Sequence, residues 1–404
     1  MKSLLVSGTY FPPQVGGISH FMAEIATALG PEQVCCLTGV PAARAKRATA
    51  SGPRVYRRPA VFSKRTAVQL AGLGAAMTEI ALRERPRVVQ FAMASEAYLG
   101  PWIERALGLP YVVYAHGNEI LDAIQSTWDR PRRALQAAAR VFANSRFTAG
   151  LVEEAGVRPD RIDIIHPGCD TDLFRPVATD PDLKRRLLGD RAPGRVILSV
   201  GGLVPRKGHD TVLRCMPELL RRFPDVTYLI VSSDRRNYEN LDSLARELGV
   251  RDQLRVCFDL PTSELPSVYA ISDVFAMPSR GRLELCDVEG FGIVFLEANA
   301  CGKPVVGGRS GGIADAIADG VSGLLVDPND PSDTARAISQ LLDNPEAATR
   351  MGRQGRSRVI EQFTWRRVAH RVQAALVGTR KEKLRPGQPA SHNSLMSSGP
   401  RSLK

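Results

Sequence analysis

The chain has 404 residues, of which 44% are hydrophobic and 24% charged, and this composition excludes a wholly disordered, collagen-like or coiled-coil protein. Its formal net charge of +12 favours anionic partners such as phosphate-bearing substrates, nucleic acid or an anionic membrane surface. Seven cysteines without a Cys-x-x-Cys pair are too few for a disulfide scaffold and predict reduced thiols in a cytoplasmic protein.

Short apolar runs alternate with longer helical segments, and a polar, proline-containing stretch at 168–187 interrupts the alternation once. Because such alternation is typical of parallel sheets with helices on both faces, we predict two doubly wound α/β domains in tandem. The predicted strands are 3–7, 33–37, 88–91, 111–114, 141–143 and 162–165, then 196–200, 227–231, 255–258, 274–277, 304–306 and 324–326. The predicted helices include 18–29, 67–83, 97–107, 211–223, 238–248, 293–301 and 334–342.

These elements predict a first Rossmann-like domain over 1–175 and a second over 176–363, with a ligand cleft between them. The amphipathic stretch 364–377 predicts a further helix, which we expect to pack back on the first domain. Residues 379–404 are rich in proline, glycine and serine, carry six basic residues and one acid, and predict a disordered basic tail. No apolar run resembles a signal-peptide core or a membrane span.

Two glycine-rich turns after predicted strands offer anion-binding groups. In the first, Gly16 and Gly17 open a helix whose amino end suits a phosphate, although an ordinary strand-to-helix turn is the alternative. It lacks the G-x-G-x-x-G spacing of dinucleotide-binding proteins. In the second, Gly202 precedes Arg206 and Lys207, and two cations at this edge of a sheet can neutralise a leaving diphosphate. A solvated basic loop is the alternative there.

A third glycine-rich segment carries two carboxylates separated by seven residues, Glu289 in a loop and Glu297 on the apolar helix that follows. Two helical turns span roughly 12 Å, close to the length of a folded sugar-diphosphate-ribose unit. Between the acids, the backbone amides of Phe291, Gly292 and Ile293 form a helix amino end suited to phosphates. The segment predicts a sugar-nucleotide site, with a chance pair of acids as the alternative.

These segments resemble the retaining nucleotide-sugar glycosyltransferases of family four, which have the GT-B fold of two facing Rossmann-like domains. The resemblance covers residues 1–378 and is strongest in the second half. Within the family, the chain looks most like the bacterial phosphatidylinositol mannosyltransferases that use GDP-mannose. The resemblance rests on Glu289-x7-Glu297 and on the segments 9–13, 16–18, 204–208, 276–280, 287–290, 292–294, 300–306 and 310–312.

The resemblance implies two sets of site residues. The donor-binding set would be Gly16, Gly17, Gly202, Phe291, Gly292, Ile293 and Glu297, with Glu297 on the ribose hydroxyls. The catalytic set would be His116, Arg206, Lys207 and Glu289. In it, Lys207 would hold the diphosphate, Glu289 the donor-sugar hydroxyls, and His116 would line the reacting sugar. Without the resemblance, a histidine after a strand is more often a loop or core residue.

Three positions depart from the family pattern. Family members often carry an arginine that holds the diphosphate where this chain has Gly202, and Arg206 could substitute for it. Glycine usually follows two strands of the second domain, where this chain has Ser232 and Asp259. Because those turns border the base pocket in the family, UDP- and ADP-sugars stay open as alternatives to GDP-mannose.

The implied reaction is hexose transfer with retention, in which the leaving diphosphate can take the acceptor's proton, so no dedicated base is required. Arg206, Lys207 and the helix amino end would stabilise the leaving group. Asp170 and Asp172 form a D-x-D sequence, the metal signature of other glycosyltransferases, but their place between the domains predicts loop residues. We expect no essential metal and no cofactor, a nucleotide-sugar donor, and a lipid-linked or glycan acceptor.

The first domain is expected to bind the acceptor. Its stretch 41–65 carries eight basic residues and no acid, with apolar residues interleaved or following closely. This pattern predicts either peripheral contact with the anionic inner face of the cell membrane or a solvated loop and helix of a cytoplasmic protein.

Three other classes of function are less well supported. A dinucleotide-dependent oxidoreductase would need the missing glycine fingerprint. A nucleic-acid-binding protein would need a helix-turn-helix, zinc or RNA-binding signature, and none is visible, so we expect no nucleic-acid partner. A non-catalytic sugar-nucleotide binder would need a disabled site, whereas His116, Lys207, Glu289 and Glu297 are all present.

Overall fold

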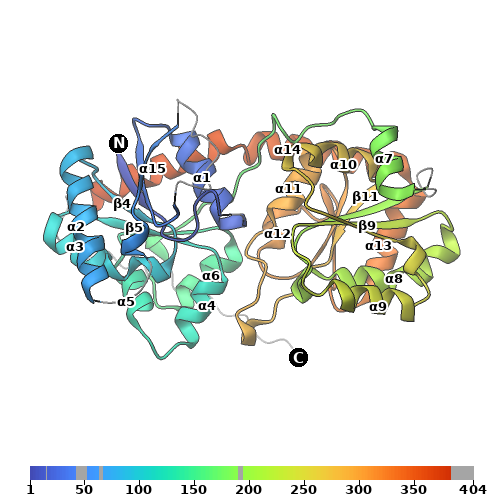
Figure 1. The fold of residues 1–404 in the computed structure, drawn as a ribbon, viewed down its shortest axis with the longest axis horizontal. Helices are drawn as coiled ribbons and strands as arrows, with labels where there is room; N and C mark the ends of the chain where they lie inside the picture. Colours follow the sequence, from blue (N-terminus) through green and yellow to red (C-terminus); the bar gives the residue numbers. More distant parts are fainter. Residues whose placement is uncertain (15, 42–51, 63–66, 190–193, 384–404) are drawn as a thin grey trace, which may run out of the picture.

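The computed structural model describes residues 1–14, 16–41, 52–62, 67–189 and 194–383. Two parallel sheets lie side by side, each between layers of helices (Figure 1). We call β1 to β7 with the helices between them and α15 the first half, α7 to α14 the second half, and residues 165–180 the connecting segment. This arrangement confirms the predicted pair of doubly wound α/β sheets.

The bounds of the elements are as follows. The strands are β1 (Ser3–Val6), β2 (Val34–Thr38), β3 (Arg54–Arg57), β4 (Val89–Phe91), β5 (Tyr111–Ala115), β6 (Arg140–Ala143), β7 (Ile162–Ile164), β8 (Val196–Val200), β9 (Thr227–Ser232), β10 (Leu254–Phe258), β11 (Val274–Met277), β12 (Val305–Gly308) and β13 (Gly323–Val326). The α-helices are α1 (Gly17–Leu29), α2 (Ala67–Glu84), α3 (Gly100–Leu107), α4 (Asn118–Gln125), α5 (Arg130–Ala137), α6 (Arg146–Glu154), α7 (Pro181–Leu188), α8 (His209–Arg222), α9 (Tyr238–Glu247), α10 (Leu265–Ile271), α11 (Ile293–Ala300), α12 (Ile313–Ala316), α13 (Pro331–Asp343), α14 (Pro345–Gln362) and α15 (Trp365–Lys383).

The two sheets share one strand order. The first runs β3-β2-β1-β4-β5-β6-β7 and the second β10-β9-β8-β11-β12-β13, with all pairs parallel. The central strands are apolar and buried on both faces, as strands covered by helices on both sides must be. The order reverses between β1 and β4 and between β8 and β11, so the loops at these carboxyl ends are the expected ligand sites.

The edge strand β3 is the one strand that the sequence analysis does not predict. Its sequence is Arg-Val-Tyr-Arg, and only Tyr56 is buried, so it lacks the apolar run that marks the other strands. It pairs with β2 in parallel, from Cys35 opposite Arg54 to Thr38 opposite Arg57. An edge strand needs only one partner and one covered face, which explains its polar sequence.

The last helix, α15, crosses from the second half and covers one face of the first sheet (Figure 1). Trp365, Val368, Val372 and Leu376 are buried there in a cluster with residues of α1. The helix continues to Lys383, so residues 379–383, predicted as tail, are helical; the remainder of that tail lies outside the described residues. No helix within the described ranges is both long and apolar enough to cross a membrane.

Candidate active site

A cleft of about 410 Å³ lies where the carboxyl ends of the two sheets face each other. Every predicted site residue except Gly202 and Glu297 lines it. Ten other residues line it. Five fall in segments that carry the family resemblance, namely Tyr10, Ile18, Val288, Gly290 and Val294, whereas Phe21, Asn118, Glu119, Asn144 and Pro167 were not singled out from the sequence. Asn118 and Glu119 come two and three residues after His116 in the segment that follows the same predicted strand, so their position was an available signal.

On the second half, a charge pair joins two loops that are far apart in the sequence. Lys207 ends a 3₁₀ turn (Pro205–Lys207) after β8, and its Nζ lies 2.6 Å from Oε2 of Glu289. Both side chains are nearly buried, at 12% and 13% exposure. Burial alone would raise the pKa of Glu289, but the charges of Lys207 and Arg206 outweigh burial and hold it below its ordinary value.

Arg206 lies beside this pair. Its Nε is 3.8 Å from Glu289 Oε2 and 3.6 Å from Asp287 Oδ1. The Nε atom is buried, and among the described residues it has no hydrogen-bond acceptor within reach. A buried guanidinium nitrogen that donates no hydrogen bond, in the wall of a cleft, suits an anionic ligand.

The amino end of α11 faces the same space, because Phe291, Gly292 and Ile293 all line the cleft. Gly292 caps the helix with a φ of 93°, in the left-handed region, where glycine is favoured. The first amides of this eight-residue helix are free of intrahelical partners and carry the positive end of its dipole. Together with Lys207 and Arg206, they form a positively polarised wall.

His116 lines the opposite wall, directly after β5. Its Nε2 is 2.9 Å from the carbonyl oxygen of Ala92, so Nε2 carries the proton and donates. Phe21 packs edge-on against the ring, with centroids 5.6 Å apart, and the His116 amide donates to Glu119 Oε1 at 2.5 Å. The imidazole is therefore held in one orientation. Gly16 and Gly17 border the same wall at the start of α1.

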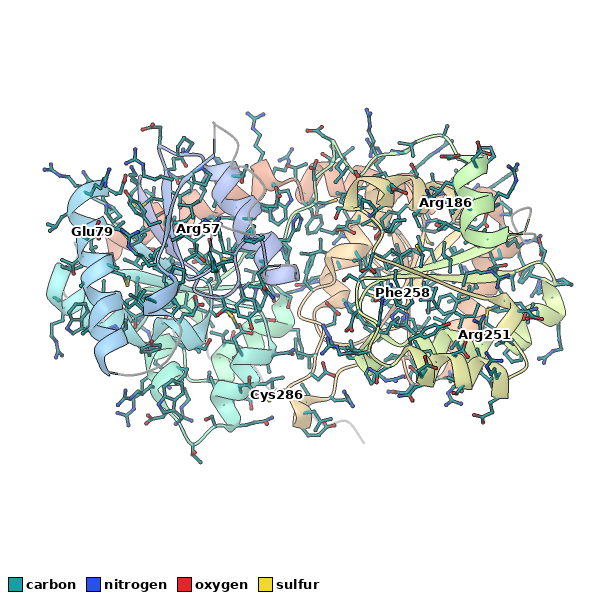
Figure 2. The ribbon with its side chains drawn as sticks, in the orientation of Figure 1. Arg57, Glu79, Arg186, Arg251, Phe258 and Cys286 are labelled. Atoms are coloured by element: carbon teal, nitrogen blue, oxygen red, sulfur yellow. The ribbon has the colours of Figure 1, made fainter. Side chains whose placement is uncertain are left out.

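The loop that carries Glu289 packs tightly on the first half. A Cβ on Gly290 would lie 2.0 Å from the carbonyl oxygen of His116, so only glycine allows this approach. The Val288 amide donates to Asn118 Oδ1 at 2.8 Å, and the Val288 side chain is buried in the core cluster of the first half. The preceding Cys286 lies at the boundary between the halves (Figure 2), where its Sγ donates to Gln125 Oε1.

Gly202 and Glu297, both on the second half, do not line the cleft. Glu297 is half-buried on α11, and the hydroxyl of Tyr269 donates to it at 3.0 Å. Burial raises the pKa of Glu297 to about 7, against the lowering effects of Tyr269 and Lys207. The carbonyl of Gly202 accepts a 3.2 Å hydrogen bond from His209 Nε2.

The departure at Asp259 has a conformational reason. Its φ is 58°, so the backbone after β10 adopts the left-handed conformation, which glycine, asparagine and aspartate tolerate best. Arg235 Nη2 donates to the Asp259 carboxylate at 2.9 Å, and the Arg235 guanidinium lies 4.2 Å from the ring centre of Phe258, labelled in Figure 2. A charged pair thus replaces the usual glycine at this edge of the second sheet.

The D-x-D aspartates are turn residues. Asp170 Oδ1 accepts the amides of Asp172 and Leu173, each at 3.0 Å, in the connecting segment. Within the part of the chain that the structure describes, no three histidine, cysteine or acidic side chains gather as a metal site.

The described part of the basic stretch 41–65 is engaged within the protein. Arg57 Nη1 donates to the carbonyls of Pro12 and Val40, at 3.1 and 2.8 Å, and so supports the loop after β1. Arg54 pairs with Glu84 at 2.7 Å. The side chains at 44, 46, 47, 64 and 65, also counted in this stretch, lie outside the described residues.

Comparisons with known proteins bear on both halves. Residues 15–173 match the family model described as "Glycosyltransferase Family 4", and residues 182–358 match "Glycosyl transferases group 1". The chain is similar to the "GDP-mannose-dependent alpha-(1-6)-phosphatidylinositol monomannoside mannosyltransferase" of Mycolicibacterium smegmatis, with 34% identity over 92% of this chain and 98% of that protein. The Mycobacterium tuberculosis protein of the same name is 32% identical over 94% of this chain and 99% of its own length.

Solved structures share the fold at lower identity. The complex of Anabaena Alr3699/HepE with UDP has a TM-score of 0.77 at 20% identity, covering 94% of this chain and all of its own. Sucrose-phosphate synthase from Thermosynechococcus elongatus has a TM-score of 0.74 at 20% identity, covering 95% of this chain and all of its own. At such identities the likeness concerns the fold alone.

Proposed function

Because the chain belongs to the family-four glycosyltransferases and has their GT-B fold, we propose that it transfers mannose from GDP-mannose, with retention, to a mannosylated phosphatidylinositol lipid. It is a hexosyltransferase. Support for this donor and acceptor comes from relatives aligned over nearly their whole length, whose names specify both. The observation that carries the proposal is the facing of His116 and the Lys207–Glu289 pair across one cleft of about 410 Å³.

The charges of the cleft suit a diphosphate leaving group. Lys207, Arg206 and the amides at the start of α11 would stabilise the negative charge that develops as the bond to the anomeric carbon breaks. Glu289, held ionised by its cations, would accept hydrogen bonds from donor-sugar hydroxyls. Close packing of the Glu289 loop against the first half at Gly290 would help to hold these groups in position for the reaction.

The first-half wall suits the sugar and the acceptor. The carbonyl of Ala92 fixes Nε2 of His116 as a donor, so the other ring nitrogen is an acceptor when the imidazole is neutral. In this geometry His116 would orient a hydroxyl rather than serve as the nucleophile. The departing phosphate would take the acceptor's proton on the same face of the sugar, which retains the anomeric configuration.

We expect no essential metal, since two cationic side chains and a helix amino end are available for the diphosphate. Mannosyl transfer in excess EDTA tests this expectation directly. Loss of transfer in EDTA, with recovery on added Mg²⁺ or Mn²⁺, would refute it.

A lipid acceptor requires that the protein reach a membrane, and we propose peripheral contact through the basic stretch 41–65. Arg58 belongs to it. In the described structure it pairs with Glu79 at 3.6 Å and donates to the Arg57 carbonyl at 3.3 Å, whereas Arg57 supports the loop after β1. Arg58→Glu should weaken flotation with vesicles that contain phosphatidylinositol and leave the thermal stability unchanged. Equal flotation of both proteins would count against this surface.

The donor is tested by thermal shift against GDP, UDP, ADP, NAD and their sugar conjugates. A ligand at 100 times its Kd adds about 2.7 kcal/mol of stability. We expect shifts with GDP and GDP-mannose, and loss of transfer without loss of folding in His116→Ala. A shift with UDP- or ADP-sugars alone would replace the donor, and a shift with NAD alone would overturn the glycosyltransferase function.

A further inference from the structure

One buried carboxylate of the second half binds both the first half and the connecting segment. Asp315 lies on α12, and its side chain is 4% exposed. Its Oδ2 accepts the backbone amide of Arg146 at 2.7 Å, and its Oδ1 accepts Nε of Arg146 at 2.7 Å. Nε2 of His166 donates to Oδ2 at 2.9 Å.

Among the described residues, the ionisable side chains that bond to Asp315 are all bases. They are Arg146 at the start of α6, His166 in the connecting segment, and Arg358 of α14, which donates to the Asp315 carbonyl at 2.6 Å. Burial would raise the pKa of Asp315, but the bonds from His166 and Arg146 lower it to about 2. The carboxylate is therefore ionised at neutral pH.

Short paths of a few residues and one or two hydrogen bonds lead from this carboxylate to both walls of the cleft. Three residues before Asp315, the Gly312 amide donates to the carbonyl of Glu289 at 2.9 Å. Two residues before Arg146, Nδ2 of Asn144 donates to the carbonyl of His116 at 3.1 Å. Asp315 thus joins the backbone that holds Glu289 to the backbone that holds His116.

A third path passes through His166. Its ring lies 5.5 Å from that of Phe291, whose residue lines the cleft just before the cap of α11. The same imidazole contacts Phe363, at 5.7 Å, where α14 gives way to α15. The hydrogen bond to Asp315 therefore also fixes the packing behind the amino end of α11.

We propose that Asp315 is a positioning residue for sugar transfer: its carboxylate sets the spacing between His116 on the first half and Glu289 on the second. It touches neither substrate nor reacting atoms, because it does not line the cleft. Its loss should leave both sheets folded and let the two walls separate. Misplacement of reacting groups by about 1 Å can cost about a hundredfold in rate.

The first test is hydrogen exchange, which needs no activity. The Val288 amide bonds to Asn118 across the boundary between the halves, so its exchange reports their separation. We expect Asp315→Ala to speed exchange of peptides covering 286–290 by about tenfold, the loss of roughly one charged hydrogen bond. Peptides within β8 should keep their wild-type rate.

A matched control is Asp242→Asn. Asp242 is also a nearly buried aspartate with two arginine partners, Arg246 and Arg251, but all three lie in the second half. It should lose stability without faster exchange at 286–290. Should Asp315→Ala fail to fold, Arg146→Ala removes the side-chain partner of Asp315 on the first half. Because the Arg146 side chain is 72% exposed, this variant should fold, and exchange at 286–290 should speed up by a smaller factor.

The second test is kinetic, and it rests on the proposed mannosyl transfer. In Asp315→Ala, kcat should fall further than the affinity for GDP-mannose. Wild-type exchange in both Asp315→Ala and Arg146→Ala, or losses of kcat and donor affinity that are equal, would overturn the positioning role. Faster exchange in a protein whose wild type transfers no mannose would support the positioning role and refute the proposed function.

Discussion

Lys207 and Glu289 lie 82 residues apart in the chain and form one ion pair, 2.6 Å between Nζ and Oε2, in the wall of the cleft. Each is nearly buried, and each is proposed to hold a different part of the donor. Without donor, each group neutralises the other. A diphosphate that binds Lys207 competes for its protons, which frees Glu289 oxygens for sugar hydroxyls.

This pairing predicts different outcomes for stability and for activity. Lys207→Met leaves a nearly buried carboxylate with only Arg206 nearby, so we expect a loss of about 2 kcal/mol in the free energy of unfolding, below the full cost of breaking a buried pair. The double variant Lys207→Met, Glu289→Leu should recover most of that loss. Both variants should lose about a hundredfold in kcat/KM. Recovered activity in the double variant would refute the separate roles.

Glu297 does not line the cleft, but the resemblance implies that it binds the ribose hydroxyls, and that expectation predicts pH-dependent donor binding. The pKa of Glu297 is raised to about 7, so the carboxylate that would accept ribose hydroxyls forms only as the pH passes neutrality. Affinity for GDP-mannose should rise about tenfold between about pH 6 and 8. Calorimetry should find this rise in the wild type and a flat profile in Glu297→Gln. A rise of the same size in that variant would assign it to another group.

His209 predicts a loss of stability in acid. It is buried, bonded to the Tyr228 hydroxyl and the Gly202 carbonyl, and burial lowers its pKa to about 4. The unfolded chain binds a proton near pH 6.5, so stability falls as the pH drops from about 6.5 to 4. Between about pH 7 and 4.5 the wild type should lose about 2 kcal/mol more than His209→Gln, which carries no titrating group. Urea unfolding of both proteins at both pH values measures this difference in stability. Equal losses in the wild type and in His209→Gln would contradict the prediction.

Asp259 predicts a conformational preference. With a φ of 58°, a β-branched residue there is strained, whereas asparagine tolerates the left-handed region. Asp259→Val should cost about 1–2 kcal/mol, and Asp259→Asn should be nearly neutral, since the exposed pair with Arg235 contributes little. Chemical denaturation distinguishes the two. Equal losses would mean that the charge, and not the backbone, matters here.

Much of the fold could be predicted because parallel strands buried on both faces are apolar runs. Where burial is one-sided, that signal is weak: β3 exposes Arg54 and buries only Tyr56, so it reads as part of a basic stretch. For the same reason the stretch 41–65 was predicted to face a membrane or solvent, although Arg57 within it donates to two backbone carbonyls. Local sequence reports burial and turns, but it does not report which carbonyl a side chain will meet.

The candidate site could be predicted only where its residues belong to local sequence patterns. Glycine turns after strands and the two spaced glutamates are local patterns, and they placed Lys207 and Glu289 on one wall. The bonds of Asp315 to Arg146 and His166 cross 169 and 149 residues and follow no period. Such contacts depend on how the halves are set against each other, which sequence patterns do not encode.

The passage of α15 onto the first sheet has a consequence for biosynthesis. Trp365, Val368 and Val372 cover the apolar face of β1, β2 and α1, so a segment made later covers segments made much earlier. On the ribosome, the second half can complete its own core while that face is still uncovered. Nascent chains therefore expose this apolar face of the first sheet for most of their synthesis. We expect a chaperone that binds unfolded chains to bind there.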